Sequence, residues 1–239
     1  MTTIDVHILG TSFFSTQHAS FEDVVIGHLR TVTAPTFPLL VARARRFTSL
    51  ATQLHMEVCG ALPVDVAEPP LTVFATCHGE IQTAEMLIAD FRANAMVSSA
   101  RFALSVHNSP SGLYSVATGS HAGSTTITGT NAIAAGWLEA ALTAIDAGHR
   151  VLLSIADEPV PAVFEGPTQT AGVAAAFLLG PPSHGGRRAE LAITPGAPTT
   201  EVDTLQVLAR AALLATSDRT GTVSLGPIQP GATLELRFT

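Results

Sequence analysis

The hydrophobic positions of this chain change repeatedly between helical spacing and short continuous runs. Residues 132–147 give the clearest helix, because large apolar side chains recur every three or four positions and Gly148 follows as a stop. Residues 71–76 are a continuous apolar run of strand length, and residues 124–130 are rich in β-branched side chains. Helices that alternate with buried strands indicate an α/β domain with layered α/β/α architecture.

The same patterns predict the remaining elements. We expect helices at residues 39–62, 80–91, 109–116 and 202–215, and strands at residues 4–9, 24–29, 150–156, 171–179, 189–194, 222–225 and 233–238. The strands at 171–179 and 189–194 flank the turn sequence PPSHGG, so they are expected to pair as an antiparallel hairpin. Such a pair makes the predicted sheet mixed.

Composition narrows the classes of function. Hydrophobic residues make up 46% of the 239 residues and charged residues 13%, which indicates either surface buried against a partner subunit or a tightly packed monomer. No apolar stretch approaches the roughly 18–20 residues of a membrane-spanning helix. The net charge of −7 argues against a nucleic-acid ligand, and all twelve basic residues are Arg, which excludes a Schiff-base or P-loop lysine.

Ordinary catalytic and metal-binding patterns are missing. No His or Cys residues have the spacing of metal ligands, and neither a nucleophile elbow nor a dinucleotide fingerprint occurs, so we expect no metal and no cofactor. Cys77 and His78 are adjacent, but neighbours on an extended chain point to opposite faces, which favours a buried structural Cys77. The chain start has no signal-peptide pattern, and Cys59 and Cys77 are expected to be free thiols of a cytoplasmic protein.

Residues 124–148 have the pattern of a strand, a tight turn and a helix, and this pattern places Asn131 at the start of the helix. Backbone N–H groups and the macrodipole at a helix start stabilise an anion, so a cysteine in this place becomes a reactive thiolate. Asn131 is not a nucleophile, and asparagine is also a favourable helix cap. The pattern therefore predicts the geometry of an activated nucleophile without the nucleophile.

Several segments resemble the N-terminal half of β-ketoacyl synthases. Residues 102–116, which contain the sequence SVHN, resemble the segment that leads into the acyl pocket. Residues 73–80 (VFATCHGE) resemble the strand and turn before it, and residues 45–50 (RRFTSL) resemble the first helix. Residues 123–131 (GSTTITGTN) are similar in spacing to the strand that runs into the active-site cysteine, whose position is occupied by Asn131.

The SVHN segment is most similar to the short proteins called β-ketoacyl synthase chain length factors, which accompany ketosynthases in type II systems that make aryl polyenes and related polyketides. The resemblance implies a thiolase-like fold and a single β-ketoacyl synthase N-terminal-like domain over residues 1–239. It is strongest over residues 40–195, and residues 196–239 are expected to be a divergent C-terminal extension. Neither His149 nor His184 lies in a catalytic ketosynthase motif, so the resemblance implies a pseudoenzyme with no catalytic residue.

The resemblance also implies a heterodimer with a catalytic ketosynthase, which acyl carrier protein reaches through the complex. In thiolase-fold dimers the strand before the nucleophile pairs with its counterpart across the two-fold axis, and the segment matching residues 102–116 reaches the partner's acyl tunnel. The implied dimer-strand residues are Thr125, Thr126, Ile127 and Thr128. The implied tunnel residues are Phe102, Asn108, Gly112, Leu113 and Tyr114. Phe102, Leu113 and Tyr114 are the bulky candidates, with Asn108 and Gly112 shaping the backbone, and the alternative is that they fill the core of the chain itself.

Two other functions remain open at this point. One is a small stand-alone acyltransferase or thioesterase on a truncated thiolase fold, with Cys77 or Ser111 as the nucleophile. The other is a homo-oligomeric binding protein. Neither reading involves nucleic acid or a membrane.

Overall fold

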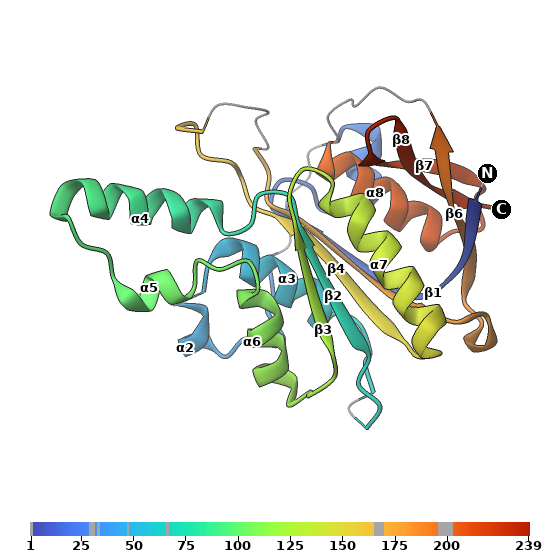
Figure 1. Ribbon diagram of the computed structural model, residues 1–239, viewed down its shortest axis with the longest axis horizontal. Coiled ribbons are helices and arrows are strands. Elements are labelled where there is room, and N and C mark those ends of the chain that lie inside the picture. The colour runs from blue at the N-terminus through green and yellow to red at the C-terminus, as the bar shows by residue number, and fades with distance from the viewer. Residues whose placement is uncertain are drawn as a thin grey trace.

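The computed structural model describes residues 2–28, 32, 34–46, 48–65, 67–164, 170–195 and 203–239 of the chain. Eight strands form one sheet, with helices on both of its faces (Figure 1). The strands are β1 Thr2–Ser15, β2 Leu71–Thr76, β3 Ser124–Thr128, β4 Val151–Asp157, β5 Val173–Gly180, β6 Arg187–Pro195, β7 Gly221–Gln229 and β8 Ala232–Phe238. The helices are α1 Phe21–Ile26, α2 Ala42–Arg45, α3 Leu50–Gly60, α4 Ile81–Asn94, α5 Ser99–Ala103, α6 Ser109–Thr118, α7 Ala132–Ala147, the 3₁₀ turn η1 Pro182–His184 and α8 Thr204–Ala215.

The sheet is mixed, as predicted. Its strand order is β3-β2-β4-β5-β1-β6-β8-β7. Strands β3, β2 and β4 run parallel to one another, and the remaining neighbours are antiparallel. The three parallel strands therefore end at one edge of the sheet, where ligands of open α/β sheets usually bind.

The predicted hairpin between residues 171–179 and 189–194 is wrong. Both segments are strands, but β1 lies between them and pairs antiparallel with β5 on one side and with β6 on the other. The N-terminal strand has fourteen residues, so it is long enough to pair along most of both neighbours. The turn sequence between β5 and β6, which contains η1, spans this inserted strand instead of closing a tight turn.

Alternate residues of each central strand face two separate hydrophobic layers. Val73 and Ala75 of β2 belong to the layer beneath α7 and α8, and Phe74 belongs to the layer beneath α3 and α6. On the α7 side, the fully buried Trp137 packs against Phe177 with ring centroids 4.7 Å apart. This alternation places the two helical layers on opposite faces and confirms the α/β/α prediction.

The first sixty residues depart most from the predicted elements. Residues 21–26 form a helix instead of the predicted strand at 24–29, because the Ser20 hydroxyl accepts from the Asp23 N–H and Gly27 provides a left-handed end. The helix predicted over 39–62 is divided into α2 and α3, and the Ser49 hydroxyl starts the second by accepting from the Thr52 N–H at 3.0 Å. Leu29, Phe47 and Val202, which lie in predicted elements, are outside the described residues.

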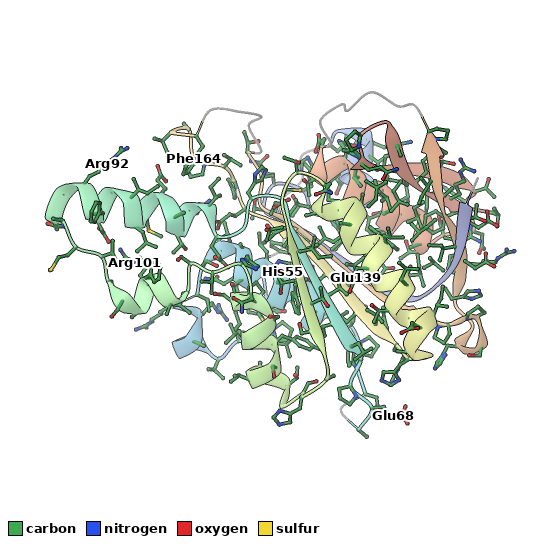
Figure 2. All side chains as sticks on the ribbon, viewed as in Figure 1. His55, Glu68, Arg92, Arg101, Glu139 and Phe164 are labelled. Carbon is green, nitrogen blue, oxygen red and sulfur yellow. The ribbon has the colours of Figure 1, made fainter. Side chains whose placement is uncertain are left out.

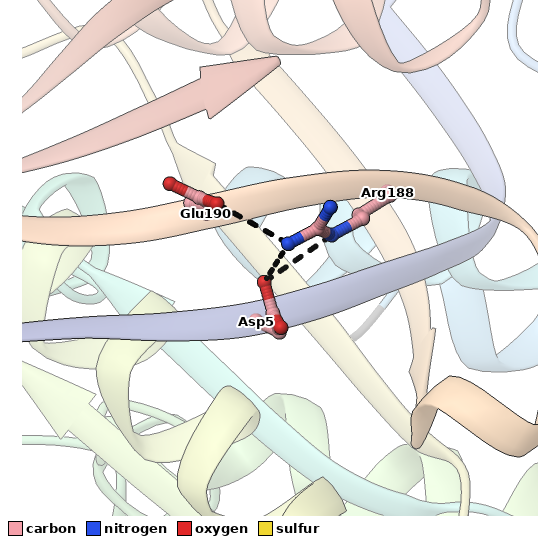
Figure 3. Close-up of polar contacts among 3 residues, drawn as sticks. All are labelled: Asp5, Arg188 and Glu190. Atoms are coloured by element: carbon pink, nitrogen blue, oxygen red, sulfur yellow. Dashed lines mark hydrogen bonds and ion pairs between the residues drawn. The ribbon is translucent and has the colours of Figure 1, made fainter. Parts of the chain in front are cut away.

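A small ionic cluster joins the outer surfaces of β1 and β6. Arg188 of β6 contacts Asp5 of β1 at 2.9 Å and Glu190 at 3.3 Å (Figure 3). Solvent screens an exposed cluster of this kind, so it contributes little to the stability of the fold. Within the described ranges, no helix has the length and apolar character that crossing a membrane requires.

The contact between α7 and β2 generates a prediction about two helical glycines. A Cβ added at Gly136 would lie 2.9 Å from the Ala75 Cβ, which is fixed to the backbone of β2. A Cβ added at Gly112 of α6 would meet no heavy atom within 4 Å. We expect Gly136→Ala to lower the free energy of unfolding by about 1–3 kcal/mol through overpacking, and Gly112→Ala to raise it by roughly 0.5–1 kcal/mol through helix propensity. Urea unfolding measures both, and equal effects would contradict the close approach of α7 to the sheet.

Candidate functional site

The carboxyl ends of β2, β3 and β4 bring together three segments that sequence analysis treated separately. Cys77 follows β2, Asn131 lies three residues beyond β3 and directly before α7, and Asp157 ends β4. Asn131 is exposed, and its carbonyl accepts from the Ala135 N–H at 2.9 Å. Its side chain makes no capping hydrogen bond, so the interpretation of Asn131 as a side-chain cap is wrong. The amide therefore stands at the helix start without a structural role in capping it.

The buried carboxyl of Asp157 joins several segments at this end of the sheet through hydrogen bonds. One of its oxygens accepts from the Thr76 hydroxyl at 2.8 Å, the Cys77 N–H at 2.8 Å and the His78 N–H at 3.1 Å. The other accepts from the Thr204 hydroxyl of α8 at 3.2 Å. Burial raises the pKa of this carboxyl, and the hydrogen bonds to Thr76, Cys77 and His78 oppose the rise. Asp157 thus ties β2, β4 and α8 together.

The two alternative nucleophiles are held in unreactive settings. Burial, and next the charge of Asp157, raise the pKa of the Cys77 thiol well above its ordinary value, so the thiol stays protonated. Ser111 donates its hydroxyl proton to the Asn108 carbonyl at 2.9 Å. No hydrogen bond joins Ser111 to a histidine within the described chain. Neither residue has the partner that would activate it.

Glu158 joins the N-termini of two helices, and sequence analysis missed it. Its fully buried carboxylate accepts from the Ala51 N–H of α3 at 3.1 Å and from the Gln82 N–H of α4 at 2.7 Å. Burial raises its pKa to about 7, and the charge of the nearby Glu80 adds to the rise. One oxygen of Glu80 accepts from the Thr52 hydroxyl at 2.7 Å, and the other has no partner among the described residues. The signal in the sequence was an acidic pair directly after a buried strand.

Helices α4 and α5 form an arm that projects from the body of the molecule (Figure 1). The arm, defined here as residues 81–103, is fixed to the body at its root, where Thr83 and Leu87 are buried, and an Arg101–Asp90 ion pair of 2.6 Å joins its two helices. Figure 2 shows Arg92 and Arg101 on the outer part of the arm, away from the body. Exposed apolar side chains run along the arm and into α6: Met86, Ile88, Phe91, Met96, Val97, Phe102, Val106 and Val116.

The structure brings four of the five predicted tunnel residues to one region. Asn108, Gly112 and Leu113 line a cavity of about 320 Å³ between α6 and the start of α3, and Phe102, 60% exposed, precedes the cavity residue Ala103. Tyr114 lies apart from them. It is 3% exposed, and its ring packs edge-on against Phe74 at 5.9 Å between centroids. A tunnel role for these residues stays a prediction.

The four predicted dimer-strand residues lie on β3, the edge strand of the sheet. The Gly123 carbonyl and the Gly129 N–H both form hydrogen bonds with β2. The odd-numbered residues of this segment therefore direct their backbone N–H and C=O groups toward β2. By the same alternation, Thr126 and Thr128 direct their backbone N–H and C=O groups away from β2, toward the open side of the edge strand. The side chains of Thr125 and Thr128 are exposed, Thr126 and Ile127 are half-buried, and Ile127 packs against the core beneath α7. The edge is thus free of charged side chains.

No metal site is indicated in this region. Within the ranges that the structure describes, no three His, Cys, Asp or Glu side chains come together in a way that could hold a metal ion. The acidic residues at the carboxyl ends accept hydrogen bonds from the protein itself, through backbone N–H groups and threonine hydroxyls.

Comparisons with known proteins give one family and one fold. The family described as β-ketoacyl synthase, N-terminal domain, matches residues 22–220. A chain from the complex of the ketosynthase ApeO with its chain length factor ApeC from Xenorhabdus doucetiae is similar with a TM-score of 0.72 and 18% identity, over 98% of this chain and 99% of that one. A chain of the ishigamide ketosynthase/chain length factor has a TM-score of 0.70 and 12% identity, over the same shares. The thiolase-like ketosynthase fold is therefore shared over nearly the whole length, whereas a search of curated proteins found no match.

The raised pKa of Glu158 generates a prediction about stability and pH. Between its ordinary pKa of 4.5 and about 7, the folded chain holds a proton that the unfolded chain releases. Stability therefore falls as the pH rises through this window, by up to about 1.4 kcal/mol per pH unit. Glu158→Gln replaces the titrating carboxyl with an amide that does not titrate. Unfolding free energies measured at a series of pH values should therefore depend less on pH in this variant than in the wild type.

The matched control is Glu68→Gln, since the Glu68 side chain is 73% exposed and its only ion pair among the described residues is a 3.8 Å contact to Arg150 (Figure 2). This variant should keep the pH dependence of the wild type. If Glu158→Gln and Glu68→Gln give parallel curves, Glu158 does not carry the linked proton.

Proposed function

This chain belongs to the β-ketoacyl synthase N-terminal domain family, and on that premise we propose that it is a non-catalytic chain length factor. It would pair with a β-ketoacyl-acyl carrier protein synthase in the cytoplasm and shape the tunnel that holds the growing acyl chain. The pathway would be type II polyketide, aryl polyene or fatty-acid-like biosynthesis. The observation that carries the proposal is Asn131, an exposed amide directly before α7, at the position that the sequence resemblance matches to the ketosynthase cysteine.

The surroundings of Asn131 support a site without a nucleophile. The neighbouring thiol of Cys77 is kept protonated by burial and by Asp157, and Asp157 is engaged with the protein. A covalent acyl intermediate needs a thiolate or an activated hydroxyl, and the described residues at this edge offer neither. The stand-alone acyltransferase with Cys77 or Ser111 as nucleophile is therefore the weaker candidate.

The apolar arm supports pairing with a second subunit. Several large hydrophobic side chains are exposed on this projecting pair of helices, and contiguous exposed apolar patches mark protein interfaces. The similar solved structures are complexes of a ketosynthase with a chain length factor, which favours a ketosynthase as the partner. Acyl carrier protein would then reach this chain through the complex.

The free edge of β3 suits the predicted pairing across the interface. Its outward N–H and C=O groups can bond to an antiparallel strand of the partner, and threonine side chains favour an extended backbone. The 320 Å³ cavity lies beside the arm, lined by Asn108, Gly112 and Leu113. A tunnel that reaches this surface would meet those residues and Phe102, whose bulk would limit the chain length.

We predict that Thr126→Pro prevents assembly with the ketosynthase. Proline removes an outward N–H and leaves the inward bonds of β3 to β2 in place, so the chain should fold yet lose a bond to the partner strand. After co-expression, affinity purification of the ketosynthase should recover wild-type chain and at least tenfold less of the variant. Thr126→Val keeps the N–H and the β-branched shape, and should be recovered like the wild type. Recovery of both variants in equal amounts would exclude β3 as the dimer strand.

We predict that Phe102→Ala lengthens the products of the complex. Phe102 is 60% exposed, so the truncation should leave the fold intact, and it removes bulk at the residue before Ala103, which lines the 320 Å³ cavity. Mass spectrometry of products from the reconstituted complex should show a shift of at least one extension unit. Val163→Ala, at another exposed apolar position, is the control and should give the wild-type distribution. An unchanged distribution from an intact Phe102→Ala complex would remove this residue from the tunnel.

A further inference from the structure

Two buried carboxyl groups lie at the root of the arm, where α4 leaves the body of the molecule (Figure 1). Glu158 is 0% exposed, and Glu80, the residue before α4, is 5% exposed. Glu158 accepts from the Gln82 N–H of α4 at 2.7 Å and from the Ala51 N–H of α3 at 3.1 Å. Glu80 accepts from the Thr52 hydroxyl of α3 at 2.7 Å. The start of α4 is therefore tied to the body through these two acidic side chains.

Few other contacts hold α4 in place. Of its fourteen residues, all of which the structure describes, only Thr83 and Leu87 are buried. The Gln82 side chain adds one hydrogen bond, from its amide to the Pro159 carbonyl at 3.0 Å. An isolated helix of this length is marginal in water, and segments with few buried apolar contacts open before the rest of a fold. The order of α4 therefore depends on its root.

No cationic side chain forms an ion pair with either carboxyl within the described ranges. One oxygen of Glu80 has no hydrogen-bond partner among the described residues. The charges that act on Glu158 are those of Glu80 and Asp157, and both are negative. His78, which follows β2, acts on Asp157, whereas the buried His55 of α3 stays neutral because burial lowers its pKa to about 3. Charges on both Glu80 and Glu158 would thus be buried together without compensation.

The cost of that state is the cost of keeping water away from two like charges. Burial raises the pKa of Glu158 to about 7, and the charge of Glu80 adds to the rise. Burial also raises the pKa of Glu80, and the hydroxyls of Ser49 and Thr52 oppose that rise. A proton on the pair removes one of the two charges. Once both are charged, movement of α4 away from α3 would admit water and relieve the cost.

We propose that the root of the arm is a proton-controlled hinge, which is locked while the Glu80–Glu158 pair holds a proton and loosened when both carboxyl groups are charged. In the locked root Glu158 keeps its proton up to a pH of about 7, whereas a hydrated carboxyl loses it near its ordinary pKa of 4.5. Opening between these values releases a proton, so it is favoured by up to about tenfold per pH unit. The hinge is a property of the free chain, and its test is independent of any partner subunit.

The test is hydrogen exchange of the purified full-length chain, resolved by residue with NMR and corrected for the intrinsic exchange rate at each pH. The protection of the Gln82 amide and of α4 should fall by at least roughly tenfold between about pH 5 and pH 7. Because only the root opens, this protection should not change in urea up to about 1 M, whereas that of α7 should fall. The proposal is overturned if the protection of α4 is the same at both pH values. It is also overturned if α4 and α7 respond equally to urea, since α4 would then open only when the whole chain unfolds.

Two substitutions test the pair itself. Glu158→Gln keeps an acceptor for the helix N–H groups but does not titrate, so the protection of Gln82 should vary much less with pH than in the wild type. Glu80→Gln removes the neighbouring charge and leaves the hydrogen bonds of Glu158 in place. It should reduce the fall in protection, because the pKa of Glu158 loses one of the causes that raise it.

The matched control is Glu85→Gln, which makes the same change within α4 but five residues beyond Glu80. This variant should keep the pH dependence of the wild type. Glu80→Gln carries the test if Glu158→Gln does not fold. A wild-type pH dependence in either variant of the pair, once folded, would overturn the hinge.

Discussion

The hydrogen bonds that β1 makes along both of its edges hold the structure together. On one side β1 pairs with β5, which continues through β4 to the parallel strands, and on the other side it pairs with β6, which continues to β8 and β7. Without this strand the parallel part and the antiparallel part would be separate sheets. The buried layers beneath α7 and α8 extend across the junction, so the apolar core is continuous because β1 is in place.

The carboxyl ends of the parallel strands gather buried acidic side chains. Asp157 ends β4 and Glu158 follows it, and together they hold α3, α4 and α8 through backbone N–H groups and a threonine hydroxyl. Helix starts present unpaired N–H groups, and here the protein provides a buried carboxyl group of its own to accept from them. These carboxyl groups position helices, and the exposed Asn131 lies directly before α7.

Local patterns in the sequence sufficed where an element is defined by its own residues. Helix α7 and strand β2 begin and end where the hydrophobic spacing predicts, because the apolar face and the flanking glycines are contained in the segment. The partner of a strand depends on distant residues, and therefore the pairing of β5 with β6 was predicted wrongly. Tyr114 and Gly112 both lie in α6 but line different cavities, and Glu158 binds the starts of two helices. Both arrangements depend on three-dimensional packing that no spacing encodes.

The arm has a consequence for how a cell would handle this protein. If a partner subunit covers the arm, as proposed, a newly made chain displays Phe91, Met96 and Phe102 to water until it assembles, and surfaces of that kind are recognised by chaperones and proteases. An excess of this subunit would then be degraded as an orphan. Its abundance would follow that of its partner without any dedicated control of expression, so the stoichiometry of the assembly would be maintained by the lifetime of the unpaired chain.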